Sequence, residues 1–314
     1  MTSVITLTMN PALDLSTTVE EVLPFRKLRS GTVRRDPGGG GINAARVVNR
    51  LGGKAIAVYP VGGPAGQLLQ QLVDAQGVVS RVVPIGGDTR EDFSVFETRT
   101  GRQFRFVTPG PKLAEAEWRA CLAVFEQLCE ESGYAIVSGS LPPGVPDDDF
   151  FGAVARVAKA RRTKLTVDTT GAGLQAALRE GVFLIKPNQN EFADLVGLRA
   201  PDMHAMIAAA RNLIAAGRIE AIALSLADEG AVLVTRERSW RARAPHVDVL
   251  STVGAGDSFL GAMVWSLAEG HAWQEALRLA VAAGSAALLS PGTDLAQAQE
   301  VHRLSGEVVV EDVA

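Results

Sequence analysis

Short apolar and β-branched runs alternate with longer amphipathic segments along most of the chain. The short runs predict strands at residues 4–8, 54–60, 134–138, 164–167, 183–185, 221–225 and 231–235. The amphipathic segments predict helices at residues 66–76, 115–131, 148–161, 190–196, 202–216, 259–268, 272–290 and 295–303. Alternation of this kind is typical of an α/β fold, in which helices cover both faces of a mostly parallel sheet.

Two β-rich stretches, at about residues 15–35 and 88–108, interrupt this alternation. The first contains short β-like pieces at residues 16–19 and 30–34, and the second predicts two strands around a turn at residues 100–102. Strands inserted between α/β units predict a small β lid that projects from the main body.

The predicted lid strands carry apolar side chains with few partners of their own, among them Val95, Phe104 and Phe106. A two-stranded insertion is marginally stable by itself and exposes its edges. We therefore expect a homodimer in which two lids pair. The lid and the main body are expected to belong to one catalytic domain, residues 1–314, because α/β folds of this length often share a single core.

A glycine-rich turn at residues 251–257 runs directly into the amphipathic segment at residues 259–268. Backbone N–H groups at a helix N-terminus lack intrahelical partners, and the helix dipole adds partial positive charge. Gly254 and Gly256 would let an anion approach this backbone, and Asp257 places a carboxylate beside it. The pattern indicates either a phosphoryl-transfer site with Asp257 as general base or an ordinary glycine-rich loop before a helix.

Four consecutive glycines at residues 38–41 precede a segment with helical periodicity. The run is not a dinucleotide-binding fingerprint, because Gly38, Gly40 and Asn43 occupy the three positions that need glycine. The sequence has no Walker A motif either. We interpret the glycines as a close backbone approach to a polyhydroxy ligand, with Asn43 supplying a donor and an acceptor, rather than as packing residues.

The formal net charge is −4, and 47% of the residues are hydrophobic and 21% charged. These values fit a globular enzyme and, without any basic tract, argue against a nucleic-acid partner.

No apolar run reaches the roughly 18 residues of a membrane-spanning helix, and residues 1–8 lack the basic start of a secretion signal. Cys121 and Cys129 are the only cysteines, which fits a reducing compartment. We expect a cytoplasmic protein with no membrane partner.

Three motifs occur in a fixed order: residues 38–43, residues 186–188 with Glu191, and residues 252–257. In this order they resemble the signatures of the ribokinase-like (PfkB-type) carbohydrate kinases, and the resemblance covers nearly the whole chain. It implies a ribokinase-like three-layer sandwich with a mostly parallel central sheet and a small β-sheet lid. It also implies ATP and Mg²⁺ as cofactors.

Within the family the chain is most similar to the minor bacterial ATP-dependent 6-phosphofructokinases, with tagatose-6-phosphate kinases and 1-phosphofructokinases as near relatives. The similarity lies in Asp14, residues 27–29, Arg90, residues 105–107 and residues 138–145. A basic lid suits a phosphosugar, because Arg and Lys hold phosphate through charge-assisted hydrogen bonds. The resemblance implies phosphorylation of fructose 6-phosphate to fructose 1,6-bisphosphate, and tagatose 6-phosphate or fructose 1-phosphate stay open as alternative acceptors.

The resemblance also implies a role for each matching residue. In catalysis, the base would be Asp257 and the anion hole would comprise Gly254, Ala255 and Gly256. The sugar and its phosphate would be bound by Asp14, Lys27, Gly38, Gly39, Asn43, Arg90, Arg105 and Ser140. The nucleotide would be bound by Lys186, Asn188, Ser225 and Gly230, and Mg²⁺ by Glu191 through water. A monovalent cation, K⁺, would be held by Ser251, Val253, Ser290 and Gly292.

A non-catalytic, sugar-binding regulator on the same scaffold is the alternative from another functional class. Asp257 and Glu191 argue against it, because they supply the base and the metal ligand that the kinase reaction needs. ATP consumption that depends on a phosphosugar would exclude the regulator.

Overall fold

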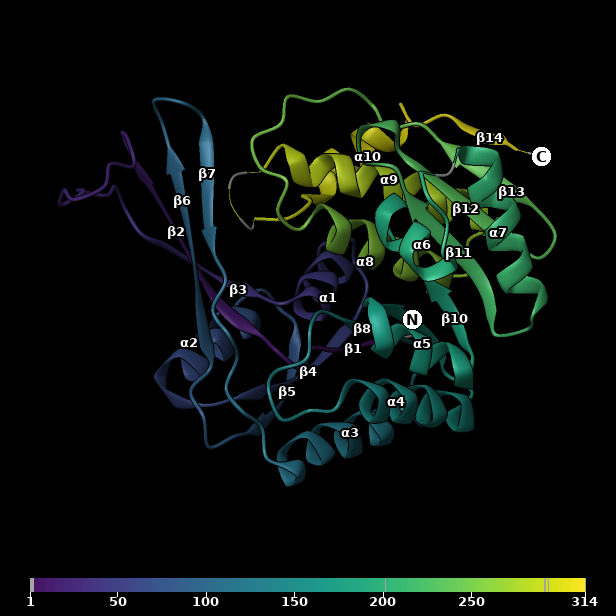
Figure 1. The fold of residues 1–314 in the computed structure, drawn as a ribbon, viewed down its shortest axis with the longest axis horizontal. Coiled ribbons are helices and arrows are strands. Elements are labelled where there is room, and N and C mark those ends of the chain that lie inside the picture. Colours follow the sequence, from purple (N-terminus) through teal and green to yellow (C-terminus); the bar gives the residue numbers. More distant parts are fainter. Residues whose placement is uncertain (1–2, 201, 291, 293, 314) are drawn as a thin grey trace.

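The structure, a computed structural model, describes residues 3–200, 202–290, 292 and 294–313. Within these residues a ten-stranded sheet has the strand order β14-β13-β12-β11-β10-β9-β8-β1-β4-β5 (Figure 1). Its strands are β1 (Val4–Leu7), β4 (Ala55–Val61), β5 (Val79–Pro84), β8 (Tyr134–Ser138), β9 (Lys164–Asp168), β10 (Val182–Ile185), β11 (Ile219–Ser225), β12 (Ala231–Thr235), β13 (Ser239–Ala242) and β14 (Val310–Asp312). Neighbours from β5 to β11 are parallel, and those from β11 to β14 are antiparallel. The predicted α/β fold with a mostly parallel sheet is confirmed.

Helices pack on both faces of this sheet, and each face has its own apolar core. On one face lie α1 (Gly40–Arg50), α2 (Gly63–Asp74), α8 (Ala255–Ala268), α9 (Trp273–Leu288) and α10 (Ala298–Ser305). On the other face lie α3 (Glu115–Cys129), α4 (Asp147–Arg161), α5 (Gly171–Glu180), α6 (Gln189–Val196) and α7 (Met203–Ala215). Fully buried side chains such as Phe125 and Phe150 each contribute about 1.5–3 kcal/mol to such cores. The two cores hold the strand ends, and therefore the loops beyond them, in fixed positions.

Elements that the pattern did not predict have weak hydrophobic signals. β5 and β14 are the edge strands of the main sheet, and β13 is only four residues long and includes Arg241. α5 has glycines in its first turn, which lowers helix propensity. Tertiary packing explains one of these glycines, Gly173, because a Cβ there would lie 2.5 Å from the Phe151 ring.

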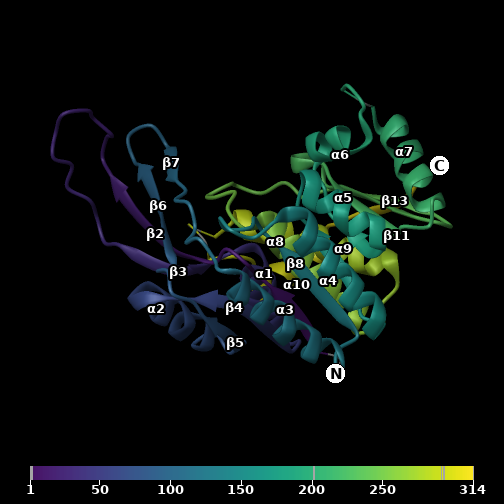
Figure 2. The ribbon, with the colours of Figure 1, turned by 60° about the horizontal axis from the view of Figure 1, so that its bottom comes forward.

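A second, four-stranded sheet stands away from the main body (Figure 2). Within the described residues its order is β3-β2-β6-β7, formed by β2 (Ala12–Val19), β3 (Arg34–Gly38), β6 (Arg90–Glu97) and β7 (Arg102–Phe106). One expectation about this region was wrong, because the strand expected at residues 30–34 begins only at Arg34. Asp14 lies inside β2. Pairing with β2 extends β3 through Pro37 to Gly38, which joins the smaller sheet directly to the glycine run.

No helix in the described part of the chain combines the length and the apolar character that crossing a membrane requires.

Candidate active site

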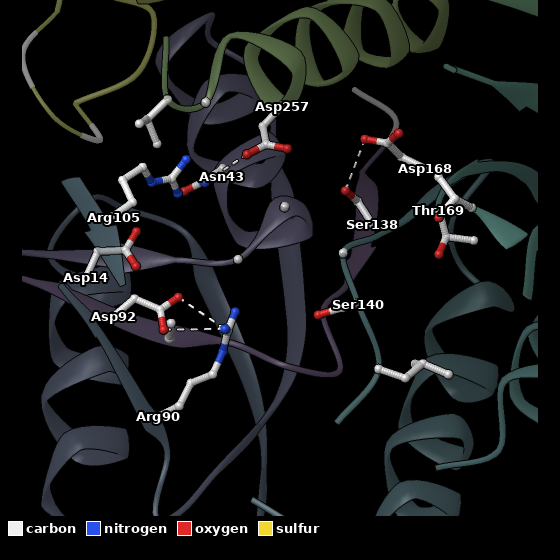
Figure 3. Close-up of a pocket in the computed structure, with 18 of the residues that line it drawn as sticks. Asp14, Asn43, Arg90, Asp92, Arg105, Ser138, Ser140, Asp168, Thr169 and Asp257 are labelled. Atoms are coloured by element: carbon white, nitrogen blue, oxygen red, sulfur yellow. Dashed lines mark hydrogen bonds and ion pairs between the residues drawn. The ribbon is translucent and has the colours of Figure 1, made fainter. Parts of the chain in front are cut away.

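A cavity of about 630 Å³ lies between the smaller sheet, the start of α8 and loops beyond the carboxyl ends of β8 and β9 (Figure 3). Ligands of open α/β sheets collect in crevices of this kind. The predicted site residues that line it are Asp14, Gly39, Asn43, Arg90, Arg105, Ser140, Glu191, Val253, Gly254 and Asp257. The structure thus brings the glycine run, the late acidic residue and the basic lid residues together.

The glycine turn lies at the start of α8, as predicted, although the helix begins at Ala255 rather than at Phe259. Gly254 is the N-cap residue and has a φ of 76°, and a Cβ there would lie 2.3 Å from Leu295 Cδ2. Glycine is therefore required at this position by backbone conformation and by space. Asp257 belongs to the first helical turn, where open N–H groups and the helix dipole favour an anion.

Asp257 accepts a hydrogen bond from Asn43, whose Nδ2 lies 2.9 Å from Asp257 Oδ2 (Figure 3). Burial raises the pKa of Asp257 from 3.8 to about 6, and the charge of Asp168 acts in the same direction. The Asn43 hydrogen bond and the charges of Lys186 and Arg46 oppose this rise. Asp257 is therefore mostly ionised at neutral pH and still basic enough to accept a proton in a reaction.

Lys186 lies beside the start of α8, because a Cβ on Gly256 would be 3.4 Å from its Nζ. Its ammonium group is buried and pairs with Asp168 Oδ1 at 3.3 Å. Burial alone lowers the pKa of Lys186, but Asp168 and Asp257 outweigh this effect and raise it overall. A permanent positive charge therefore stands next to the open helix terminus.

Asp14 forms the opposite wall of the cavity, on strand β2. The pKa of Asp14 is raised to about 7, most of all by burial and next by the charge of Asp92 on β6. Arg105 and Arg90 act in the opposite direction. Two acids and two arginines thus face one another on the smaller sheet (Figure 3).

Arg90 and Arg105 differ in how firmly they are held. Arg90 donates to the backbone carbonyls of Asn10 and Thr108 and pairs with Asp92 at 3.1 Å. Arg105 is exposed on β7, and its guanidinium extends into the cavity (Figure 3). Most N–H groups of Arg90 already have protein acceptors, so Arg105 is the better placed of the two to receive a new anion.

Gly39 and Gly41 are required for packing, contrary to our interpretation of the whole glycine run. Gly39 has a φ of 120°, and a Cβ there would lie 2.7 Å from Thr8 Cγ2. A Cβ on Gly41 would lie 2.5 Å from Thr8 Oγ1 and 2.9 Å from the carbonyl oxygen of Leu7. The start of α1 therefore packs directly on the end of β1.

Gly38 and Gly40 instead face functional side chains. A Cβ on Gly38 would lie 2.5 Å from Asp14 Oδ2. One on Gly40 would lie 2.2 Å from Ser138 Oγ and 3.2 Å from Asp257 Oδ1. The backbone at these two glycines therefore passes between Asp14 on the smaller sheet and Asp257 on α8.

Asn188 and Glu191 cap the start of α6 reciprocally. The backbone N–H of Asn188 donates to Glu191 Oε2, and that of Glu191 donates to Asn188 Oδ1, both at 2.9 Å. Glu191 also lines the cavity. Among the described residues no three His, Cys, Asp or Glu side chains gather into a metal-binding cluster. Mg²⁺ that keeps much of its water and binds nucleotide phosphates needs few protein ligands, so the Glu191 carboxylate fits this ion.

Several predicted ligand residues lie outside the cavity lining. Lys27 is exposed in the loop between β2 and β3. Asn188 and Ser225 form a β-bridge, so the structure brings these two together on neighbouring strand ends. A Cβ on Gly230 would lie 2.1 Å from the carbonyl oxygen of Ala242, so glycine is needed there for packing.

The four residues expected to hold a monovalent cation lie in two neighbouring loops. Ser251 Oγ donates to the carbonyl oxygen of Gly292 at 3.0 Å and accepts from the backbone N–H of Val253 at 3.2 Å. Ser290 Oγ donates to the carbonyl oxygen of Leu295 at 3.0 Å. Ser251, Val253 and Gly292 are thus joined by hydrogen bonds, whereas the Ser290 hydroxyl is bound to Leu295.

Asp168, Asp92 and Ser138 line the cavity but were not named as site residues. Asp168 Oδ2 accepts a hydrogen bond from Ser138 Oγ at 3.4 Å, in addition to its pairing with Lys186. A usable signal existed for Asp168, because an acidic residue directly follows the strand predicted at residues 164–167. Asp92 gave no such signal, since charged residues are common on exposed strands.

The family model for "pfkB family carbohydrate kinase" matches residues 3–299. The chain belongs to the pfkB family of carbohydrate kinases. It is 44% identical over 300 residues to ATP-dependent 6-phosphofructokinase isozyme 2 of Mycobacterium tuberculosis, covering 96% of this chain and 88% of the relative. It is 38% identical over 307 residues to the Escherichia coli enzyme of the same name, covering 97% and 98%. This kinase is also similar to a 1-phosphofructokinase of Bacillus subtilis, at 28% identity over 97% of this chain and 98% of the relative.

Solved structures of phosphofructokinase-2 from Escherichia coli superpose closely on this kinase. The complex with fructose-6-phosphate has a TM-score of 0.92 at 36% identity and covers 98% of this chain and 99% of the other. The complex with potassium has a TM-score of 0.93 at 37% identity, with the same coverage. A tetrameric inhibited form has a TM-score of 0.91 at 36% identity, again with that coverage. The ribokinase-like sandwich with its smaller second sheet is confirmed.

Proposed function

We propose that this kinase transfers the γ-phosphoryl group of ATP to the 1-hydroxyl of fructose 6-phosphate, giving fructose 1,6-bisphosphate and ADP. The position of Asp257 carries the proposal. Its carboxylate stands at the open start of α8 and lines a cavity whose other wall holds Arg90 and Arg105. A base, an anion-binding helix start and a basic wall for a second phosphate share one cavity. The 6-phosphofructokinase relatives support this choice of acceptor.

Asp257 takes the proton of the 1-hydroxyl as that oxygen attacks the γ-phosphorus. The new P–O bond forms while the bond to the bridging oxygen breaks, and ADP leaves with that oxygen. The backbone N–H groups of Gly254, Ala255 and Gly256 meet the charge of the transferring phosphoryl group, and Lys186 adds a positive charge beside them. These roles need positioning and charge neutralisation, with no covalent enzyme intermediate.

The 6-phosphate of the sugar binds on the lid side of the cavity. Arg105 reaches it with an exposed guanidinium, and Arg90 and Ser140 supply further donors. Lys27 joins only when its exposed loop moves toward this wall. The sugar hydroxyls lie against Asp14 and the backbone of Gly38 and Gly39, while the amide of Asn43 supports the base.

ATP extends from the start of α8 toward the bridged residues Asn188 and Ser225 and the turn at Gly230. Mg²⁺, when bound, neutralises phosphate charge and draws electrons from the γ-phosphorus. Glu191 would hold it through water, and its carboxylate is fixed for this by the backbone N–H of Asn188. We propose Ser251, Val253, Ser290 and Gly292 as a K⁺ site, since a relative was solved with potassium.

We assign the kinase to the cytoplasm, where ATP and phosphosugars are available, and to one catalytic domain spanning residues 1–314. We propose further that it forms a homodimer through the lid. Exposed apolar side chains on its strands and loops, Phe93, Phe106 and Val107, support this assembly. Light scattering at micromolar concentration tests it: a mass of twice 33.1 kDa is expected, and a monomer would contradict the dimer.

A coupled assay of ADP release tests the proposed function. ATP is supplied with fructose 6-phosphate, tagatose 6-phosphate, fructose 1-phosphate or no sugar. We expect the highest kcat/KM with fructose 6-phosphate and no release without sugar. A higher kcat/KM with tagatose 6-phosphate or fructose 1-phosphate would show that the protein is a kinase with a different acceptor. Sugar binding without any ADP release would identify the non-catalytic regulator instead.

A further inference from the structure

Arg46 is a buried arginine that lies behind the cavity wall rather than in it. It belongs to α1, is 1% exposed, and does not line the cavity. Its Nε donates to Gln76 Oε1 at 2.7 Å, and its Nη1 donates to the carbonyl oxygen of Pro37 at 3.0 Å. Burying a guanidinium carries a large desolvation cost, which its hydrogen bonds must offset.

A further hydrogen bond of Arg46 reaches the residue that supports the base. Nη1 donates to Asn43 Oδ1 at 3.0 Å. Asn43 Nδ2 donates in turn to Asp257 Oδ2 at 2.9 Å (Figure 3). Asn43 and Arg46 are three residues apart on α1, so they share one helix face. The two ends of one amide are therefore bound by a cation and by the carboxylate.

This arrangement permits only one orientation of the Asn43 amide. If the amide were flipped, its oxygen would face the Asp257 carboxylate and its NH₂ would face the Arg46 guanidinium. Acceptor would then oppose acceptor, and donor would oppose donor. Arg46 thus selects the orientation in which Asn43 donates to the carboxylate.

We propose that Arg46 is a positioning residue that acts through Asn43 to hold the Asp257 carboxylate in place for proton transfer. The inference rests on the proposed function, in which Asp257 is the base. It adds a residue outside the cavity to the machinery of that reaction. A rate loss is expected when Arg46 is changed, because small displacements of a reacting group are costly.

Arg46 also contributes to the electrostatic balance at the base. Asp168 on β9 faces Asp257 as a second acid, and Lys186 after β10, Asn43 and Arg46 on α1 favour its ionised form. Removal of Arg46 loses a positive charge and frees the Asn43 amide to turn away. The carboxyl group would then take up its proton at a higher pH.

The test measures kcat, both KM values and the pH dependence of kcat for a double-mutant cycle of Arg46→Met and Asn43→Ala. Arg46→Met is expected to lower kcat about tenfold, which corresponds to one lost hydrogen bond, and to leave both KM values within about twofold. The pH of half-maximal kcat should rise by about one unit. In the double variant, Arg46→Met should add little to the loss caused by Asn43→Ala, because both act through one amide.

Arg50→Met is the matched control. Arg50 lies one turn further along α1 and shares Gln76 Oε1 with Arg46, but its other hydrogen bonds go to Asp294 and Ala296. Its replacement should leave the pH of half-maximal kcat unchanged. An equal shift in this control would show a general charge effect and overturn the role of Arg46.

If the kcat losses of Arg46→Met and Asn43→Ala multiply in the double variant, the two residues act independently and the role of Arg46 is wrong. A raised KM with an unchanged kcat in Arg46→Met would also contradict it. If Arg46→Met does not fold, Arg46→Lys is carried through the same cycle, and the same non-additivity with Asn43→Ala is expected. If the wild-type protein phosphorylates no sugar phosphate, the proposed function is wrong. If the wild type is active and the Arg46 variants keep its kcat and pH profile, only the role of Arg46 is wrong.

Discussion

Two of the acids that line the cavity, Asp257 on α8 and Asp14 on β2, have raised pKa values for the same first reason, which is burial. Their partners differ. The nearest support of Asp257 is a neutral amide held in one orientation, whereas Asp14 faces the acid Asp92 and two arginines. The base is thus held by a hydrogen bond without a ligand, while the charges around Asp14 would change when a phosphate binds.

Exposure differs in the same way between the two sides. Lys186 beside α8 is 7% exposed, while Arg105 on β7 is an exposed residue next to the exposed Phe106. Side chains fixed by two apolar cores suit a reaction that needs accurate positioning. Side chains on a projecting sheet suit recognition, because they order when the substrate arrives. This contrast predicts that changes on the α8 side alter kcat and changes on the lid side alter KM.

The largest expected effect is that of Asp257→Asn. Loss of the base should lower kcat about 100-fold or more and leave both KM values nearly unchanged. Steady-state kinetics of the purified variant check this. The matched control, Asp14→Asn, should raise KM for the phosphosugar much more than it lowers kcat. Near wild-type turnover by Asp257→Asn would show that Asp257 is not the base and that the two sides of the cavity do not differ in this way.

The two arginines sharpen the contrast within the lid. Arg105→Ala should raise KM for fructose 6-phosphate about 10–100-fold, because it removes charge-assisted hydrogen bonds, and should leave Tm unchanged. Arg90→Ala should raise KM and also lower Tm, since Arg90 ties the backbone carbonyls of Asn10 and Thr108 to the wall. Kinetics and thermal scans of both variants test this. An unchanged KM in both would discredit the phosphate site.

Gly38, the last residue of β3, and Gly40, the first residue of α1, test the two sides of the cavity separately. Gly40→Ala places a methyl group against Ser138 and Asp257 and should lower kcat about tenfold or more. Gly38→Ala places one against Asp14 and should act mainly on KM. Gly101→Ala is the control, because its Cβ would meet nothing within 4 Å, so only backbone strain is added there. Identical effects of Gly38→Ala and Gly40→Ala on kcat and KM would mean that the two sides of the cavity do not act separately.

The α8 side was largely predictable from sequence, and the reason is local. A glycine turn followed by an amphipathic segment can be recognised from consecutive residues alone. Asp257 was therefore placed correctly at a helix start. Arg46 was not found, because the carboxylate to which Asn43 links it, Asp257, is far away in the chain. Asp168 was missed although it directly follows a predicted strand, since its partner Lys186 is not apparent from the sequence. Asp168 meets Lys186 only because β9 and β10 are neighbours in the sheet.

The lid was predicted less well. Its four strands were expected in about the right stretches, but the piece expected at residues 30–34 is β3 at Arg34–Gly38, where Gly38 pairs with Ala12. Pairing across the smaller sheet, which joins β2 in parallel to the distant β6, decides these boundaries. Lys27 was grouped with the arginines by resemblance alone, and it lies in an exposed loop outside the cavity lining.

The smallest expected effects concern stability without ligand, and they compare the two acids directly. Each carboxyl group binds its proton more tightly in the folded chain than in the unfolded one, where the pKa is 3.8. The unfolded state then binds fewer protons, so folded stability falls as pH rises from about 4 to about 6 for Asp257 and to about 7 for Asp14.

Replacing either acid by Asn removes this penalty, so each variant should be more stable than wild type at pH 8 and similar to it near pH 4. For Asp257→Asn the gain is at most about 3 kcal/mol, or several degrees in Tm. Between pH 6 and pH 7 the advantage of Asp14→Asn should keep growing while that of Asp257→Asn has levelled off. Thermal scans across this range measure both. A gain that does not depend on pH would show that packing, rather than the buried charge, separates the variants from wild type.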